Sequence, residues 1–223
     1  MRTVNLDEID WSAVQGAYGP ATSVPTLLHQ LASSSPGERS EAIDELWGCL
    51  CHQGTVYQAS ALAVPFLFDA AKAPGLPRTE RNLLLALVVH IGLGEDTTWE
   101  GYTPWAVVQD CAQAVRGLMP ELVGWARDGS LEARTWTLVA AAQHPDAWAS
   151  LGVDASELMA DTDPAVADLV RHAVSGSIPE QSVLDDVLSD ADLRDYFEEV
   201  VSGLPPHQWA RRLVVELAVA ERL

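Results

Sequence analysis

Residues 107–123 read VVQDCAQAVRGLMPELV, and this stretch decides the fold. Its apolar residues recur every three or four positions, which places them on one face of a helix. They are Val107, Val108, Cys111, Ala112, Val115, Leu118, Met119, Leu122 and Val123. Residues 42–50 and 209–217 follow the same rule. No Asn-Gly or Asp-Gly pair links two alternating apolar runs, as a β-hairpin would require. The sequence therefore predicts an all-α fold.

Two further features predict where helices lie and end. Residues 83–89, LLLALVV, are apolar on every side, which predicts a fully buried helix, with a buried parallel strand as the alternative. A cap residue precedes a proline in Ser35-Pro36, Thr103-Pro104 and Asp163-Pro164. We expect Gly54 to end one helix and Thr55 to cap the next. Gly94, Gly129 and Gly176 are further expected ends. These signals predict ten or more short helices.

Three segments of the chain align on an arginine at their fifth position. They are residues 35–43 (SPGERSEAI), 77–85 (PRTERNLLL) and 130–138 (SLEARTWTL). A fourth segment, residues 163–171, fits with Ala167 at that position. Helix pairs in which a short Asp- or Ser-Pro turn opens the second helix, with an arginine after it, are similar to HEAT repeats.

The resemblance implies an α-solenoid, a right-handed superhelix of HEAT-like helix pairs. Residues 22–175 would form the repeats, and residues 176–223 would add acidic C-terminal helices and a capping helix, all within a single domain over 1–223. The segments 18–25 (YGPATSVP) and 52–60 (HQGTVYQAS) resemble stretches of bacterial HEAT-repeat proteins of unassigned function. The likeness implies a fold and brings no active site with it.

The charge of the chain narrows the class of partner. Its 223 residues contain 13 Lys and Arg against 32 Asp and Glu, a net charge of −19. Nucleic acids and anionic membrane surfaces are therefore poor partners, whereas a basic protein or peptide is favoured. The densest stretch is residues 180–199, whose apolar positions still predict a folded acidic helix pair. The candidate binding residues there are Asp185, Asp186, Asp190 and Asp192.

A second candidate site combines polar and aromatic residues. His52, Gln53 and Tyr57 stand between two apolar helices and could line a pocket in which His52 handles a proton. The alternative is that helix capping explains this stretch. Trp99, Tyr102 and Trp105 lie in or beside an insertion at residues 94–104, where solenoids often bind partners. The alternative for these rings is that they fold back over the core.

Metal and catalytic motifs are sparse. Cys49, Cys51 and His52 suggest zinc, but residues two apart on a helix point about 200° away from each other, so one metal fits only if the helix ends between them. The sequence contains no nucleophile elbow, phosphate loop or His-Glu-x-x-His motif. We therefore expect no metal and no cofactor, and the missing motifs favour a non-catalytic protein over an enzyme. The absence of a signal core or a long apolar run predicts a cytoplasmic protein that does not insert into a membrane.

These observations lead to two expectations of function. The first is a non-catalytic module that binds a basic protein or peptide through an acidic solenoid face with aromatic anchors. An immunity-like protein that masks a basic nuclease toxin is one concrete form of it. The alternative is a small-molecule-binding protein or enzyme with a pocket around His52, Tyr57 and Trp99. A deep aromatic cavity would favour the alternative, and a shallow acidic groove would favour the first.

Overall fold

The computed structural model describes residues 5–93, 103–160 and 162–220. Within them the chain is mostly helical, with eleven α-helices, short 3-10 and π turns and two minimal β-hairpins. The all-α expectation is therefore confirmed at the level of fold class. The chain divides into two compact units, Met1–Gly117 and Leu118–Leu223, and the boundary falls inside one long helix, α5 (Trp105–Asp128).

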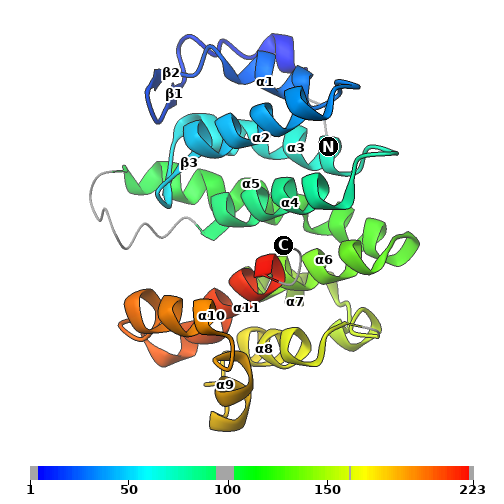
Figure 1. Cartoon of the computed structure of the whole chain (residues 1–223), viewed down its shortest axis with the longest axis vertical. Helices are drawn as coiled ribbons and strands as arrows, with labels where there is room; N and C mark the ends of the chain where they lie inside the picture. The colour runs from blue at the N-terminus through cyan, green and yellow to red at the C-terminus, as the bar shows by residue number, and fades with distance from the viewer. Residues whose placement is uncertain (1–4, 94–102, 161, 221–223) are drawn as a thin grey trace. The chain divides into compact units, whose positions relative to one another are not determined.

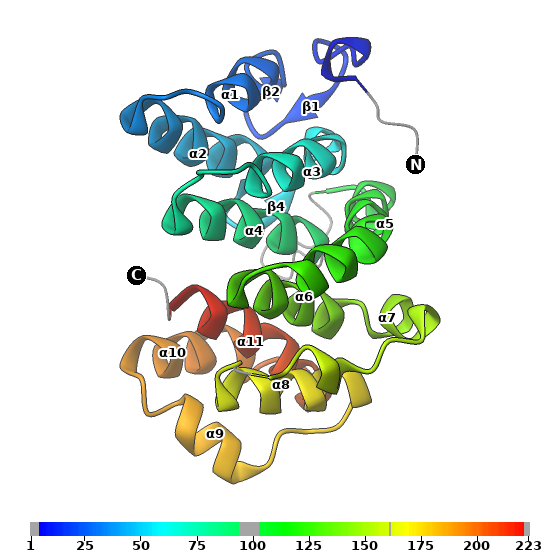
Figure 2. The ribbon, with the colours of Figure 1, turned by 90° about the vertical axis from the view of Figure 1, so that its right-hand side faces the viewer.

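Unit 1 is built from helices that pack in neighbouring pairs. Helix α1 (Val24–Gln30) packs against α2 (Pro36–Leu50), and α3 (Gln58–Ala71) packs against α4 (Arg78–Leu93). Figure 2 shows these four helices following one another in chain order. The apolar run 83–89 lies in helix α4, where Leu84 to Val89 are buried and Leu83 is half-buried. Ser35 accepts a hydrogen bond from the Glu38 N–H and caps α2, as its sequence predicts.

The aligned arginines of unit 1 tie helices to the loops before them. The Arg39 guanidinium forms an ion pair with Glu80, with an Nε–Oε2 distance of 2.5 Å, and donates to the Ser33 carbonyl at 2.8 Å. Arg81 donates to the carbonyls of Ala71 (2.9 Å) and Leu76 (3.1 Å). Both arginines thus satisfy carbonyls in the segment that precedes their own helix. The shared position in the alignment corresponds to a shared structural role in these two segments.

The stretch between α2 and α3 corrects the capping expectation. Cys51–His52 (β3) and Thr55–Val56 (β4) pair as antiparallel strands around a two-residue loop. Gln53 (φ 50°) and Gly54 (φ 83°) both have positive φ, as a type I′ hairpin turn requires. Gly54 therefore turns a hairpin instead of ending a helix, and Thr55 lies in a strand instead of capping α3. This turn has no Asn-Gly or Asp-Gly pair in the sequence, because its first residue is glutamine.

Helix α3 begins at Gln58 and is held by a serine inside its first turn. The Ser60 hydroxyl accepts from the Tyr57 N–H (2.8 Å) and donates to the Leu50 carbonyl (2.5 Å). This serine is fully buried. One side chain therefore satisfies both the start of α3 and the end of α2, which fixes the hairpin between them.

A second hairpin precedes α1. Gln15–Gly16 (β1) pairs with Gly19–Pro20 (β2), and the Ala17 N–H donates to the Cys49 carbonyl at 3.0 Å. A Cβ at Gly16 would lie 3.2 Å from that carbonyl oxygen. Glycine at this position therefore allows the hairpin to approach the end of α2. A short 3-10 turn at Leu6–Glu8 comes before it.

Unit 2 contains the rest of α5 and six more helices. They are α6 (Leu131–Gln143), α7 (Pro145–Leu151), α8 (Pro164–Ser175), α9 (Gln181–Val187), α10 (Ala191–Tyr196) and α11 (Trp209–Ala220). The last helix, α11, packs against α6 and α8, and Figure 1 shows it beside α8. Its buried residues include Leu213 and Val214, and α6 contributes Trp136. The C-terminal helix therefore completes the core of this unit.

Helix ends in unit 2 follow the sequence signals. Asp163 caps α8, as the Asp163-Pro164 pair predicts, by accepting from the Ala165 and Val166 N–H groups. Ser130, which was not predicted as a cap, caps α6. Gly176 ends α8 with φ 68°, in the left-handed conformation expected of a C-terminal glycine. Gly94 lies outside the described residues. The solenoid, its HEAT-like repeats and its single-domain extent stay predictions.

Candidate functional site

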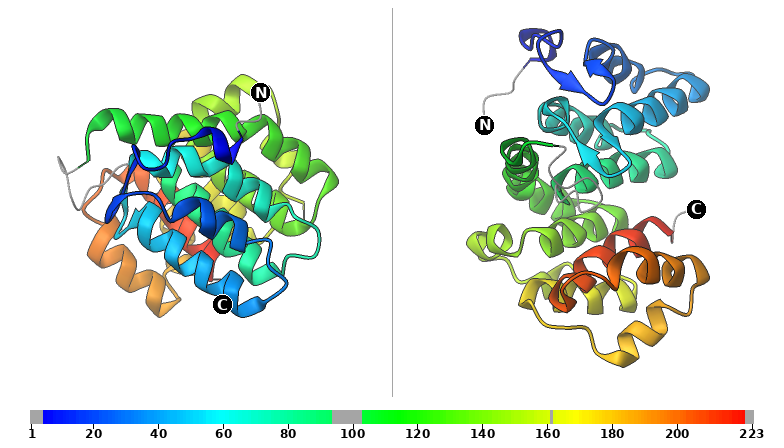
Figure 3. Two further views of the ribbon diagram at one scale, coloured as in Figure 1. Left: turned by 90° about the horizontal axis from the view of Figure 1, so that it is seen from above. Right: turned by 90° about the vertical axis from the view of Figure 1, so that its left-hand side faces the viewer.

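The two hairpins bring together a tyrosine and a histidine that are distant in sequence. The Tyr18 hydroxyl lies 3.2 Å from His52 Nδ1, and the two ring centroids are 5.3 Å apart at an angle of 59°. Tyr18 is 77% exposed, so its ring stands at the surface although its hydroxyl has a partner. Figure 3, right, shows the hairpins, dark blue and cyan, on the same side of unit 1.

The remaining predicted residues of this region are distributed around the β3–β4 hairpin. Gln53 is exposed in the turn, and Tyr57 is half-buried just before α3. Trp105 begins α5 and is 64% exposed, so its ring does not fold back over the core. The Thr103 hydroxyl donates to the Val56 carbonyl at 3.1 Å, which ties the start of α5 to β4.

Two of the predicted aromatic residues, Trp99 and Tyr102, lie outside the described residues. The hypothesis of a small-molecule pocket around His52, Tyr57 and Trp99 therefore stays a prediction. Sequence reasoning missed Tyr18 as the partner of His52. The only signal was that Tyr18-Gly19-Pro20 and His52-Gln53-Gly54 occur in the two segments that carry the family resemblance.

Cys51 and Cys111 are buried, and Cys49 is half-buried. Helix α2 ends at Leu50, between Cys49 and Cys51, which is the condition that a shared metal would need. Even so, no three His, Cys, Asp or Glu side chains gather as metal ligands in the part of the chain that the structure describes. Burial raises the pKa of Cys49 to about 11 and that of Cys111 to about 12. Both thiols are therefore protonated and unreactive at neutral pH.

The acidic segment, residues 180–199, is folded and its charge is exposed. It contains eight acidic residues, and every one of them is exposed. The same segment contains one basic residue, Arg194. Its guanidinium donates to the carbonyls of Leu188 (2.8 and 3.0 Å) and Ser189 (3.3 Å). This cation therefore satisfies backbone carbonyls instead of neutralising the carboxylates around it.

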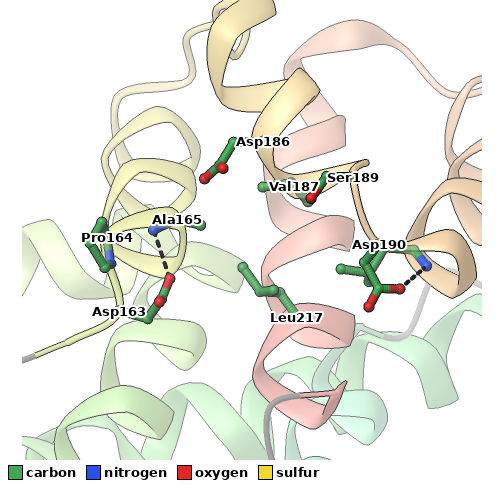
Figure 4. A pocket seen from close by; sticks show the side chains of 9 residues that line it. Asp163, Pro164, Ala165, Asp186, Val187, Ser189, Asp190 and Leu217 are labelled. Atoms are coloured by element: carbon green, nitrogen blue, oxygen red, sulfur yellow. Dashed lines mark hydrogen bonds between the residues drawn. The ribbon is translucent and has the colours of Figure 1, made fainter.

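A pocket of about 410 Å³ lies between the acidic segment and helices α8 and α11. Figure 4 shows Leu217 between Asp163 on one side and Asp190 on the other, with Asp186 on α9. The lining residues are Asp163, Pro164, Ala165, Asp186, Val187, Ser189, Asp190, Leu193 and Leu217. Val187, Leu193 and Leu217 form an apolar floor of the pocket. The carboxylates of Asp163, Asp186 and Asp190 form its rim. No lysine or arginine is among the lining residues.

Two of the three rim carboxylates also cap helices. One oxygen of Asp163 accepts from the N–H groups of Ala165 (2.7 Å) and Val166 (3.3 Å). One oxygen of Asp190 accepts from those of Asp192 (2.9 Å) and Leu193 (3.1 Å). Capping fixes these side chains in place and leaves the second oxygen of each for a ligand.

The pocket contains half of the acidic residues that the sequence singled out. Asp186 and Asp190 line it, whereas Asp185 accepts a hydrogen bond from Gln181 Nε2 (2.7 Å) and Asp192 is exposed outside the lining. Sequence reasoning missed Asp163, Leu193 and Leu217. Asp163 was recognised only as a helix cap, and nothing in the sequence brings α11 to the acidic segment.

Comparison of the chain with protein-family models, with curated proteins and with solved structures finds no match. No helix among the described residues combines the length and the apolar character needed to cross a bilayer. The geometry of unit 2 is therefore the main basis for a functional conclusion.

Proposed function

We propose that this chain is a non-catalytic binding module for a basic protein or peptide, and that the acidic segment is its contact surface. The observation that supports this proposal is the exposure of all eight acids of residues 180–199, with the one local arginine engaged by backbone carbonyls. A surface of this kind attracts a cationic partner over a distance set by the ionic strength.

The acidic segment is a folded surface with ordered carboxylates, in contrast to a disordered acidic tail. Leu184, Val187 and Leu193 are buried and hold α9 and α10 against the rest of unit 2. Ordered carboxylates lose less conformational freedom on binding than those of a disordered chain, so more of the attraction contributes to affinity. An immunity protein that masks a basic toxin is one form that such a module takes.

The test compares three versions of the full chain as baits for proteins from the native cytosol. The first is the wild type. The second replaces Asp185, Asp186, Asp190 and Asp192 with Asn, which removes four charges while the Asp190→Asn change retains a residue that can cap α10. The third removes four exposed charges from unit 1 through Glu41→Gln, Asp44→Asn, Glu45→Gln and Asp110→Asn. The two variants therefore have the same net charge.

The proposal predicts a basic protein that the wild type and the unit 1 variant retain at about 50 mM salt and release at about 500 mM salt. The variant with four substitutions in the acidic segment should fail to retain this protein at either salt concentration. The purified partner should then bind the wild type at least about tenfold more tightly than this variant. Equal retention by all three baits would contradict the proposal, as would a partner that resists salt.

A further inference from the structure

The pocket beside the acidic segment has a lining that specifies more than positive charge. Its floor consists of Val187, Leu193 and Leu217, each at most 9% exposed, and these residues come from three different helices. Because their side chains are packed in the core of unit 2, the floor is a fixed apolar surface. A ligand that only carried charge would make no apolar contact with the parts of these side chains that line the pocket.

The three rim carboxylates do not converge on one point. Asp163, Asp186 and Asp190 are not among any group of three side chains placed to hold a metal ion in the described residues. Figure 4 shows Asp163 and Asp190 on opposite sides of Leu217. The negative charges therefore surround the apolar floor instead of forming a single cation site.

We infer that the pocket accepts an apolar side chain of the partner, flanked on both sides by lysine or arginine residues. The apolar side chain would lie on Leu217 and its neighbours, and the flanking cations would meet Asp163 and Asp186 on one side and Asp190 on the other. This inference rests on the proposed function and adds the residue pattern that the partner must present. Charge complementarity with the rim carboxylates identifies the flanking residues of the partner as basic. The apolar floor identifies the central residue of the partner as apolar.

Ala165 offers a way to close the pocket without changing its charge. Its half-buried side chain lines the pocket at the start of α8, and only its backbone N–H takes part in the Asp163 cap. Ala165→Leu fills the space above the floor and keeps the three carboxylates. Ala147→Leu, at a half-buried position of α7 outside the lining, is the matched control.

The experiment measures the affinity of three short peptides for the full chain by fluorescence anisotropy at about 50 mM salt. The first peptide has a central leucine between pairs of lysines, the second has serine in place of leucine, and the third keeps the leucine but has serines in place of the lysines. The wild type should bind the first at least about tenfold more tightly than either of the others. Ala165→Leu should reduce the leucine-to-serine ratio to near one, while Ala147→Leu should preserve it.

The outcomes separate this inference from the proposed function. Equal binding of the leucine and serine peptides, lost when the acidic segment is neutralised, would overturn the inference and leave the function standing. Equal binding of the two leucine peptides would also overturn it, because charge would then be irrelevant at the pocket. If neither lysine-containing peptide binds in a way that depends on the acidic segment, both the inference and the function fail.

Discussion

At the scale of single residues, two aspartates in unit 2 both cap a helix and place a negative charge at the pocket. Asp163 and Asp190 each use one oxygen to cap a helix and present the other at the pocket. The capping role of Asp163 could be predicted from the Asp-Pro pair that starts α8. Its place in the pocket could not, because it depends on α9 and α11, which are distant in sequence.

Substitution of Asp163 separates its two roles. Asp163→Ala removes the cap of α8 and should lower the free energy of unfolding by about 1 kcal/mol. Asp163→Asn keeps the cap and should change it by only a few tenths of that amount. Urea denaturation of both variants checks this expectation. An equal loss in both would mean that the charge of Asp163, and not its capping bond, stabilises the helix.

Glu216 should make the stability of unit 2 depend on pH. Burial raises the pKa of this carboxyl, and the nearby positive charge of Arg212 only partly offsets the effect. Burial, with a contribution from the charge of Glu216, also raises the pKa of Tyr196 to about 12. The folded state therefore binds the Glu216 proton more tightly than the unfolded state does. Stability contributed by this group is present at low pH and is lost as the pH rises above the ordinary glutamate value of 4.5.

Glu216→Gln should consequently raise the melting temperature at pH 7 and leave it unchanged near pH 4, where the wild-type side chain is protonated. Thermal melts across this pH range measure the difference. Glu198→Gln, at an exposed position of the acidic segment, is the control. Because this position is not buried, the substitution should not produce the same pH-dependent rise in melting temperature. A lower melting temperature for Glu216→Gln at pH 7 would show that the interaction with Arg212 outweighs the cost of burial.

At the scale of elements, local signals predicted the starts of α2 and α8 but missed the hairpins. Caps at Ser35 and Asp163 are confirmed, because each depends on residues that are adjacent in sequence. The turn at Gln53-Gly54 was missed because glutamine rarely takes positive φ. Its conformation is imposed by tertiary bonds, in particular that of Ser60 with Leu50, and such bonds have no signature in a sequence pattern.

The cost of this turn can be measured. Asn is the preferred residue at the first position of a type I′ turn, so Gln53→Asn should stabilise the protein by about 0.5 kcal/mol. Gln53→Val should destabilise it by about 1 kcal/mol or more, since a β-branched residue is disfavoured at φ 50°. Chemical denaturation of the two variants gives both values. If Gln53→Asn were less stable than the wild type, the glutamine side chain would have a role that the turn alone does not explain.

At the scale of the whole molecule, the excess of negative charge bears on stability and is the basis of the proposed class of partner. The net charge of −19 could be read from composition, and so could its concentration in residues 180–199. The pocket could not, because its walls come from α8, α9, α10 and α11 and depend on the return of the C-terminal helix to α6 and α8.

Repulsion among these charges should make the folded state sensitive to salt. The melting temperature should rise by several degrees between about 20 and 300 mM NaCl and then level off, because the added ions screen like charges within a Debye length. Differential scanning calorimetry measures the trend, and KCl should match NaCl at equal ionic strength. A melting temperature independent of salt would show that the carboxylates are neutralised within the fold.

The most direct test of the central claim is a methyl NMR titration of the full chain with the peptide that has lysines on both sides of a leucine. We expect the methyl resonances of Val187, Leu193 and Leu217 to shift together, whereas those of Leu46 and Leu67 in the core of unit 1 stay unchanged. Raised salt should reverse the shifts. Shifts confined to unit 1, or no salt-sensitive shift at the pocket, would contradict the assignment of the acidic segment as the binding surface.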